Sequence, residues 1–143
     1  RLEAQIVLAY VVKVSDEDLA WVAPDENPAD VAARWLDLGP KLVVLTRGAA
    51  GALAQTLDGA RVDVPTLPID VVDTVGAGDA FTAGLVDGLR RYDLLGGDAR
   101  DRLGGCTDAT LRAVVERATL VAGLTCARRG ADPPTAAEVA AVS

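Results

Sequence analysis

The sequence contains no histidine and only two cysteines, Cys106 and Cys126, among its 143 residues. A histidine-containing zinc site and a catalytic triad are therefore excluded, and two cysteines cannot form a disulfide framework. The chain also contains no methionine and begins at Arg1. We therefore expect the chain to be a fragment or a processed piece. The scarcity of cysteine indicates a reducing, cytoplasmic compartment.

Positive charge is scarce, because 14 Lys and Arg residues stand against 21 Asp and Glu residues, a formal net charge of −7. Such a chain repels phosphate backbones, so nucleic acid is not an expected partner. The longest apolar run, residues 6–12, stops at Lys13 and is far shorter than the roughly 20 residues that span a bilayer. No membrane partner is expected either.

Half of the residues are hydrophobic, which suits one compact domain. A chain of this length buries about 70% of the surface that it exposes when unfolded. We find no internal repeat and no low-complexity linker, so residues 1–143 are predicted to form a single unit.

The first half of the chain predicts alternating strands and helices. The apolar, β-branched run at residues 5–14 is typical of a buried strand, and Ser15 is a good N-cap for a short acidic helix at 16–21. The next predicted elements are a helix at 29–38, a strand at 41–47, and two strands at 52–55 and 61–64 that pair around a turn at 58–59. The pattern indicates an α/β fold with a mostly parallel sheet and an antiparallel edge.

The second half predicts helices separated by glycine-rich turns. The expected elements are a helix from after Gly78 to about Arg91, a polar connection between the glycine pairs at 96–97 and 104–105, a helix at 108–125, and a short terminal helix from Thr135. Trp21 and Trp35 are predicted to anchor their helices against the sheet.

The segment at residues 73–81 places two glycines between an extended stretch and a helix. The unpaired N–H groups of such a turn, with the positive end of the helix dipole, suit a phosphate oxygen. Asp79, in the first helical turn, would stand beside that phosphate and could receive a proton from an attacking hydroxyl. This arrangement indicates phosphoryl transfer.

A simpler interpretation carries about equal weight from spacing alone. Two glycines before a helix also make a tight strand-to-helix turn, in which Asp79 is a favourable first-turn charge. The segment is not a dinucleotide-binding fingerprint, because Phe81 stands where a third glycine is required, and this disfavours a nicotinamide-dependent dehydrogenase. It is not a P-loop, because no Gly-Lys-Ser/Thr follows.

Residues 73–86 resemble the second signature of the PfkB (ribokinase-like) family of carbohydrate kinases. Three other segments agree with the family in order and spacing: residues 12–18 with its Asn-x-x-Glu stretch, residues 46–51 with its Thr-x-Gly-x-x-Gly turn, and residues 127–133 with its C-terminal loop. The resemblance implies a ribokinase-like αβα-layered fold. Nothing in the chain resembles the N-terminal half of the family, so we expect the C-terminal portion only.

The resemblance also implies roles for individual residues. Asp79 would be the catalytic base, and the backbone N–H groups of Gly76, Ala77 and Gly78 would form the anion hole. The residues implied to border ATP are Thr46, Gly48, Gly51 and Gly78. Taken alone, the first three of these are more typical of a hairpin turn than of a nucleotide site.

Two further residues are implied to lie near cations. Asp18, with Ser15, occupies the Asn-x-x-Glu position that the family uses around Mg²⁺, although both groups depart from the usual pair; a first-turn helix charge is the alternative role for Asp18. Asp73, with carbonyls near Val75 and Gly130, matches the position of a monovalent cation such as K⁺.

We therefore predict an ATP-dependent sugar kinase. The amino-acid sequences of residues 12–19 and of the loop at 126–134 are most similar to those of bacterial fructokinase-like members of the family. Fructose is therefore the first substrate expected. A ribokinase or nucleoside kinase of the same family is the nearest alternative. The other alternative is a non-catalytic fragment that binds nucleotide or dimerises. A homodimer is the expected assembly.

Overall fold

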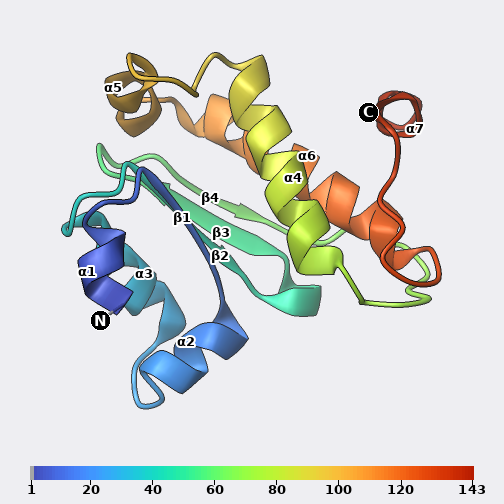
Figure 1. The fold of residues 1–143 in the computed structure, drawn as a ribbon, viewed down its shortest axis with the longest axis horizontal. Coiled ribbons are helices and arrows are strands. Elements are labelled where there is room, and N and C mark those ends of the chain that lie inside the picture. The colour runs from blue at the N-terminus through green and yellow to red at the C-terminus, as the bar shows by residue number, and fades with distance from the viewer. Residues whose placement is uncertain (1) are drawn as a thin grey trace.

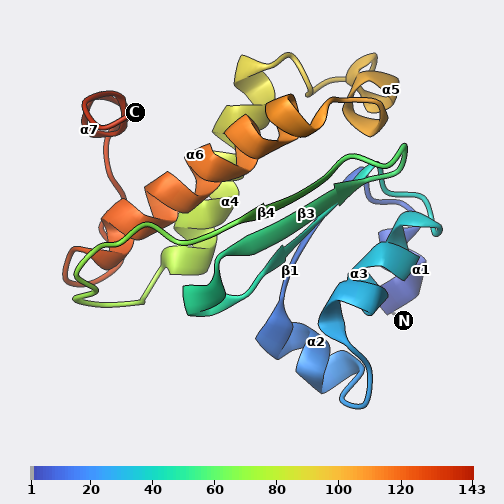
Figure 2. The same cartoon turned by 180° about the vertical axis from the view of Figure 1, so that it is seen from behind.

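The computed structural model describes residues 2–143, which form helices on both faces of one sheet (Figure 1). In chain order the elements are α1 (Leu2–Ile6), β1 (Val11–Ser15), α2 (Asp16–Val22), α3 (Pro28–Leu36), β2 (Leu42–Thr46), η1 (Gly48–Ala50), β3 (Ala52–Thr56), β4 (Arg61–Val64), α4 (Ala77–Arg91), α5 (Ala99–Gly104), α6 (Asp108–Cys126) and α7 (Ala136–Ala140). Figure 2, seen from behind, shows α4 and α6 on one side of the sheet and α1, α2 and α3 on the other. The αβα layering expected from the sequence is confirmed.

The sheet has four strands in the order β1-β2-β3-β4. β1 and β2 are parallel, with Lys13 opposite Val44, whereas β2–β3 and β3–β4 are antiparallel. The predicted antiparallel edge is therefore present, and in the described residues it supplies two of the three strand pairings. The hairpin turns at Asp58 and Gly59, as the sequence predicts.

A separate core lies on each face of the sheet. On one face, strand residues such as Val44 and Ala54 pack against α4 and α6. On the other face, Val43 and Leu45 pack against α1, α2 and α3 with the buried Trp35. The alternation of Val43 and Val44 between the two cores follows from the two-residue period of a strand.

The structure corrects three local predictions. The strand predicted at 5–14 begins only at Val11, because the chain before it forms α1 and a turn in which the N–H of Leu8 donates to the carbonyl of Gln5. The polar connection before Gly104 contains α5. Trp21 is 87% exposed and anchors nothing, since it lies two positions, about 200° around the helix, from the buried Leu19.

In the part of the chain that the structure describes, no helix has both the length and the apolar character needed to cross a membrane.

Candidate active site

The glycine-rich turn lies at the end of the sheet where β1 and β2 finish (Figure 1). α4 begins there, and η1, which directly follows β2, lies beside the start of α4 in both views. In open α/β sheets, ligands bind outside the carboxyl ends of the parallel strands. The two glycine-containing segments singled out from the sequence are therefore brought to the same edge, where a ligand is expected.

Gly76 is the N-cap of α4 and has a φ of +79°, in the left-handed region. A Cβ atom built on Gly76 would lie 2.8 Å from the Cβ of Ala131. Any other residue would therefore be strained twice, by its backbone angle and by contact with the loop after α6. This glycine sets the direction in which α4 leaves the turn.

The N–H groups in this turn are not all equally available. That of Ala77 donates to the carbonyl of Thr74 at 3.2 Å. Those of Gly76, Gly78 and Asp79 donate to no acceptor within residues 2–143. The N–H of Asp79 therefore joins the candidate anion hole; sequence reasoning missed it, although the first N–H groups of any helix lack intrahelical acceptors.

The carboxylate of Asp79 lies in the first turn of α4 and is exposed. No ion pair with a described residue occupies it. Next to it, the hydroxyl of Thr82 donates to the carbonyl of Gly78 at 2.9 Å. This hydroxyl therefore does not accept a hydrogen bond from the free N–H groups of the turn. One short segment thus combines unpaired N–H groups with a carboxylate that forms no ion pair among the described residues.

Asp73 connects the turn to the loop after α6. Its Oδ1 accepts a hydrogen bond from the N–H of Val75 at 3.0 Å, and its Oδ2 accepts one from the N–H of Gly130 at 2.8 Å. These bonds, that to Val75 first, hold the pKa of Asp73 below its usual value. Each oxygen keeps a second lone pair that a cation could use, so the predicted cation site at Asp73 remains a prediction.

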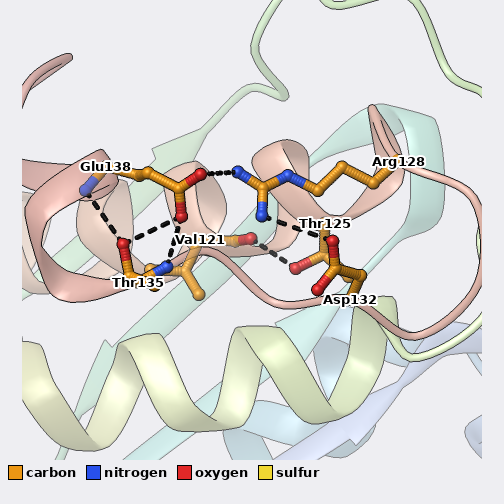
Figure 3. Close-up of polar contacts among 6 residues, drawn as sticks. All are labelled: Val121, Thr125, Arg128, Asp132, Thr135 and Glu138. Atoms are coloured by element: carbon orange, nitrogen blue, oxygen red, sulfur yellow. Dashed lines mark hydrogen bonds and ion pairs between the residues drawn. The ribbon is translucent and has the colours of Figure 1, made fainter.

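The loop after α6 is braced by Arg128 (Figure 3). Its guanidinium forms ion pairs with Asp132 at 3.5 Å and with Glu138 in α7. Glu138 also accepts hydrogen bonds from the N–H and hydroxyl of Thr135, as in a capping box. The Thr135 N–H and then the Arg128 guanidinium lower the pKa of Glu138 to about 2.

The predicted nucleotide turn follows β2 directly. Thr46 ends this strand and donates its hydroxyl hydrogen to the carbonyl of Val14 at 3.4 Å, and Gly48 begins η1. Gly51 closes the turn, since its carbonyl accepts from the N–H of Arg47 at 2.8 Å. The segment is a tight turn at the strand end, compatible with both roles considered for it.

Asp18 is engaged in capping α2. Its Oδ2 accepts a hydrogen bond from the hydroxyl of Ser15 at 2.6 Å, and its N–H donates to the Ser15 oxygen at 3.0 Å. No group of three acidic, cysteine or histidine side chains within residues 2–143 could hold a metal ion. The described residues therefore form no metal cage of their own.

One residue near the turn was not singled out from the sequence. The ammonium nitrogen of Lys13, in the middle of β1, lies 3.4 Å from the position that a Cβ atom would take on Gly78. The available signal was a single charge within an otherwise apolar strand.

A comparison with known protein families matches residues 2–138 to the pfkB family carbohydrate kinases. The chain belongs to the pfkB family. Among curated relatives, a fructokinase of Rhizobium leguminosarum bv. trifolii is 45% identical over 95 residues, which cover 66% of this chain and 29% of that protein. A fructokinase of Klebsiella pneumoniae is 37% identical over 94 residues, 65% of this chain and 30% of that protein. The aligned part thus spans less than a third of these relatives.

Solved structures share the fold over nearly the whole chain. A fructokinase double mutant from Vibrio cholerae O395, in its fructose, ADP and potassium ion bound form, superposes with a TM-score of 0.76 at 29% identity, covering 98% of this chain and 44% of that one. Aminoimidazole riboside kinase from Salmonella enterica, complexed with aminoimidazole riboside and an ATP analog, gives a TM-score of 0.76 at 26% identity and the same coverage. Nucleotide and cation binding is therefore a property found in this pfkB family.

Proposed function

We propose that the native protein carrying this chain transfers the γ-phosphoryl group of ATP to a sugar hydroxyl, with fructose as the first substrate to test. The observation that carries the proposal is the junction at the start of α4, where the free N–H groups of Gly78 and Asp79 adjoin the unoccupied Asp79 carboxylate. Membership of a carbohydrate kinase family and the similarity to fructokinases support it.

In this reaction the Asp79 carboxylate orients the sugar hydroxyl and accepts its proton. As the hydroxyl oxygen bonds to the γ-phosphorus, the bond from that phosphorus to the β–γ bridging oxygen breaks and ADP leaves. The N–H groups of Gly76, Gly78 and Asp79, at the positive end of α4, stabilise the negative charge on the equatorial oxygens. The N–H of Ala77, the remaining member of the predicted anion hole, would first have to leave Thr74.

ATP is proposed to lie along the turn that contains Thr46, Gly48 and Gly51, beside the start of α4. Mg²⁺ commonly uses substrate phosphates, water and only one or two carboxylates, which suits a site whose described residues form no metal cage. Asp18 is the carboxylate proposed near this ion, acting through water. Asp73 is proposed near a monovalent cation, which would add positive charge behind the anion hole.

The test is a coupled ADP-release assay on the native protein with fructose, ribose and a nucleoside as acceptors. We expect fructose to be turned over fastest and Asp79→Asn to lower kcat by about 10²–10⁴-fold, the range for loss of a general base. Glu116→Gln, an exposed carboxylate on α6, is the matched control and should keep full activity. Full activity in Asp79→Asn would refute the assigned role.

A second candidate is a nucleotide-binding chain without turnover. It is favoured by one observation, that the aligned part covers only 29% of the Rhizobium relative. Calorimetric titration of the 143-residue chain with ATP, followed by the same ADP-release assay, separates the two candidates. Binding without ADP release supports the second candidate for the chain alone, and ADP release with fructose excludes it.

A further inference from the structure

The turn at residues 46–51 has little rigidity of its own. Gly48 and Gly51 have φ values of +52° and +85°, and residues 48–50 are exposed. Glycine loses more conformational freedom on ordering than any other residue. A turn built from Gly, Ala, Ala and Gly therefore needs contacts from outside to keep one shape.

The side chain of Arg47 ties the turn to β4. Its Nη2 donates to the carbonyl of Ala50 at 3.1 Å and also to the Oδ1 of Asp63, with which it forms an ion pair. Asp63 is held from another side as well, because its carbonyl accepts from the guanidinium of Arg112 in α6 at 3.3 Å. Arg47 thus connects the exposed turn to a strand residue that α6 also contacts.

A second tie reaches the turn from Thr66, just after β4. Its hydroxyl donates to the carbonyl of Ala49 at 3.0 Å. At the end of the turn, a Cβ atom on Gly51 would lie 2.0 Å from the carbonyl oxygen of Val64, so the two backbones are in close approach. The carbonyls of Ala49 and Ala50 are both bound by side chains, and the turn is held in one shape against the end of β4.

Global stability is a poor explanation for Arg47. The Nε of its guanidinium is buried and has no hydrogen-bond partner among residues 2–143. A buried donor left unpaired costs free energy comparable to what a hydrogen bond contributes. The ion pair adds little, because the Asp63 side chain is 60% exposed. Arg47 should therefore contribute little to the free energy of unfolding, whereas its effect on the shape of the turn is specific.

We propose that Arg47 is a positioning residue for ATP, which acts through Ala50 and Asp63 and does not itself contact the nucleotide. The inference rests on the proposed function, in which ATP lies along residues 46–51. Because Arg47 orders the turn before ATP arrives, less conformational entropy is lost on binding. Asp79 belongs to α4, so the orientation of the sugar hydroxyl does not depend on Arg47.

Direct contact of the guanidinium with a phosphate group is the competing explanation. The two roles make opposite predictions for Asp63, an acidic residue that would not itself bind a phosphate. If Arg47 positions the turn, Asp63→Ala breaks the tie and weakens ATP binding, as Arg47→Met does. If Arg47 binds phosphate, loss of the Asp63 carboxylate frees the guanidinium and leaves ATP binding unchanged or stronger.

The test compares Arg47→Met, Asp63→Ala and Thr66→Val in the native protein. Arg34→Met is the matched control, since it removes an arginine that forms an ion pair with Glu26 away from the turn. We expect Arg47→Met to raise the KM for ATP by about 10-fold, with kcat and the KM for the sugar within about twofold of wild type. Asp63→Ala and Thr66→Val should act in the same direction, and the control should change none of these values.

Two further variants sharpen the assignment. Arg47→Lys keeps the charge but loses the planar fork that holds two acceptors, so it should recover only part of the ATP affinity. The double variant Arg47→Met, Asp63→Ala should lose no more affinity than Arg47→Met alone, because both changes break the same tie. Fully additive losses would contradict action through Asp63.

Measurements without turnover separate positioning from a loss of stability. In Arg47→Met, amide exchange at Ala50 and Gly51 should accelerate in the absence of ATP, while the urea midpoint of unfolding changes little. Wild-type ATP affinity in Arg47→Met or in Asp63→Ala, or exchange rates at the turn equal to those of wild type, would overturn the proposal. If the wild type shows no kinase activity, the proposed function fails, and the ATP affinities of the same variants by calorimetric titration still decide for or against Arg47.

Discussion

The carboxylate of Asp73 accepts a hydrogen bond from the backbone N–H of Gly130, 57 residues further along the chain. The carbonyl of Cys126, at the end of α6, accepts two more, from the N–H groups of Val72 and Asp73. The loop before α4 is thereby tied to the loop after α6. Because Gly76 has no room for a Cβ atom beside Ala131 of the second loop, we expect the orientation of the candidate anion hole to depend on these ties.

Loss of the Asp73 carboxylate should therefore reduce activity more than it reduces stability. We expect Asp73→Ala to lower kcat by up to about 10²-fold, since small displacements of groups that position a substrate have effects of this size. Steady-state assays at several K⁺ concentrations provide the measurement. A variant that higher K⁺ fully restores would point to cation binding as the main role, whereas a K⁺-independent loss would indicate the structural tie.

The Asp73 carboxylate should also make the stability of the chain depend on pH. The pKa of Asp73 is lowered in the folded chain by the N–H groups of Val75 and Gly130. Its contribution to stability is therefore fully present above the ordinary aspartate pKa and is lost as the pH falls through the folded value. Denaturant unfolding should show wild type and Asp73→Asn diverging near neutral pH and converging in acid. A constant difference at all pH values would contradict this.

The packing of α4 on α6 should be intolerant of added volume at Gly84. A Cβ atom there would lie 2.8 Å from the Cα of Ala118, a backbone atom that cannot turn aside. Gly84→Val is expected to destabilise the chain by about 1–3 kcal/mol through overpacking. Ala83→Val, an exposed neighbour on the same helix, is the control and should change stability by about 0.5 kcal/mol from helix propensity alone. Urea denaturation measures both, and equal effects would refute the packing argument.

Long, periodic and motif-bearing segments were predictable from the sequence. The helix at 108–125 is present as α6, and the strands on either side of Asp58 pair as expected. These predictions depend on local patterns, such as a helical apolar stripe and turn residues. The strand prediction for the short apolar stretch before Val11 was wrong, because an apolar run of that length fits a helix as well as a strand.

The candidate site was predictable only where its residues are contiguous. The segment from Asp73 to Asp79 was identified as a candidate site from its glycines and its carboxylates. Lys13 lies on another element, and its approach to Gly78 follows from strand register and the placement of α4, which no local pattern specifies. The contact of Asp73 with Gly130 is likewise a product of tertiary folding.

Ser15 should stabilise α2 as its N-cap. Its side-chain oxygen accepts the N–H of Asp18 at 3.0 Å, so Ser15→Ala is expected to destabilise the chain by about 1 kcal/mol. Thr107→Ala, which removes the equivalent cap of α6 at Thr110, is the matched control with a similar expected loss. If residues near Asp18 also organise Mg²⁺, Ser15→Ala alone should raise the Mg²⁺ concentration needed for half-maximal activity. Identical Mg²⁺ dependence in both variants would assign Ser15 and Asp18 to capping only.

The brace between the loop after α6 and α7 should loosen in acid. Glu138 has a pKa of about 2, lowered first by the N–H of Thr135 and then by Arg128. Its contribution to stability is thus present above the ordinary glutamate pKa of 4.5 and is lost as the pH falls from there toward 2. Carboxyl ¹³C titration by NMR should show this low value, and amide exchange around the buried Val139 should accelerate over the same range.

Arg128→Ala tests the electrostatic part of this brace. Removing the guanidinium should raise the pKa of Glu138 partway toward 4.5, because the hydrogen bonds from Thr135 remain. Arg129→Ala is the control, since the neighbouring arginine is exposed and forms no ion pair in the described part of the chain. A Glu138 titration near 4.5 in the wild type, or an equal shift in the two variants, would show that Arg128 does not hold this carboxylate in solution.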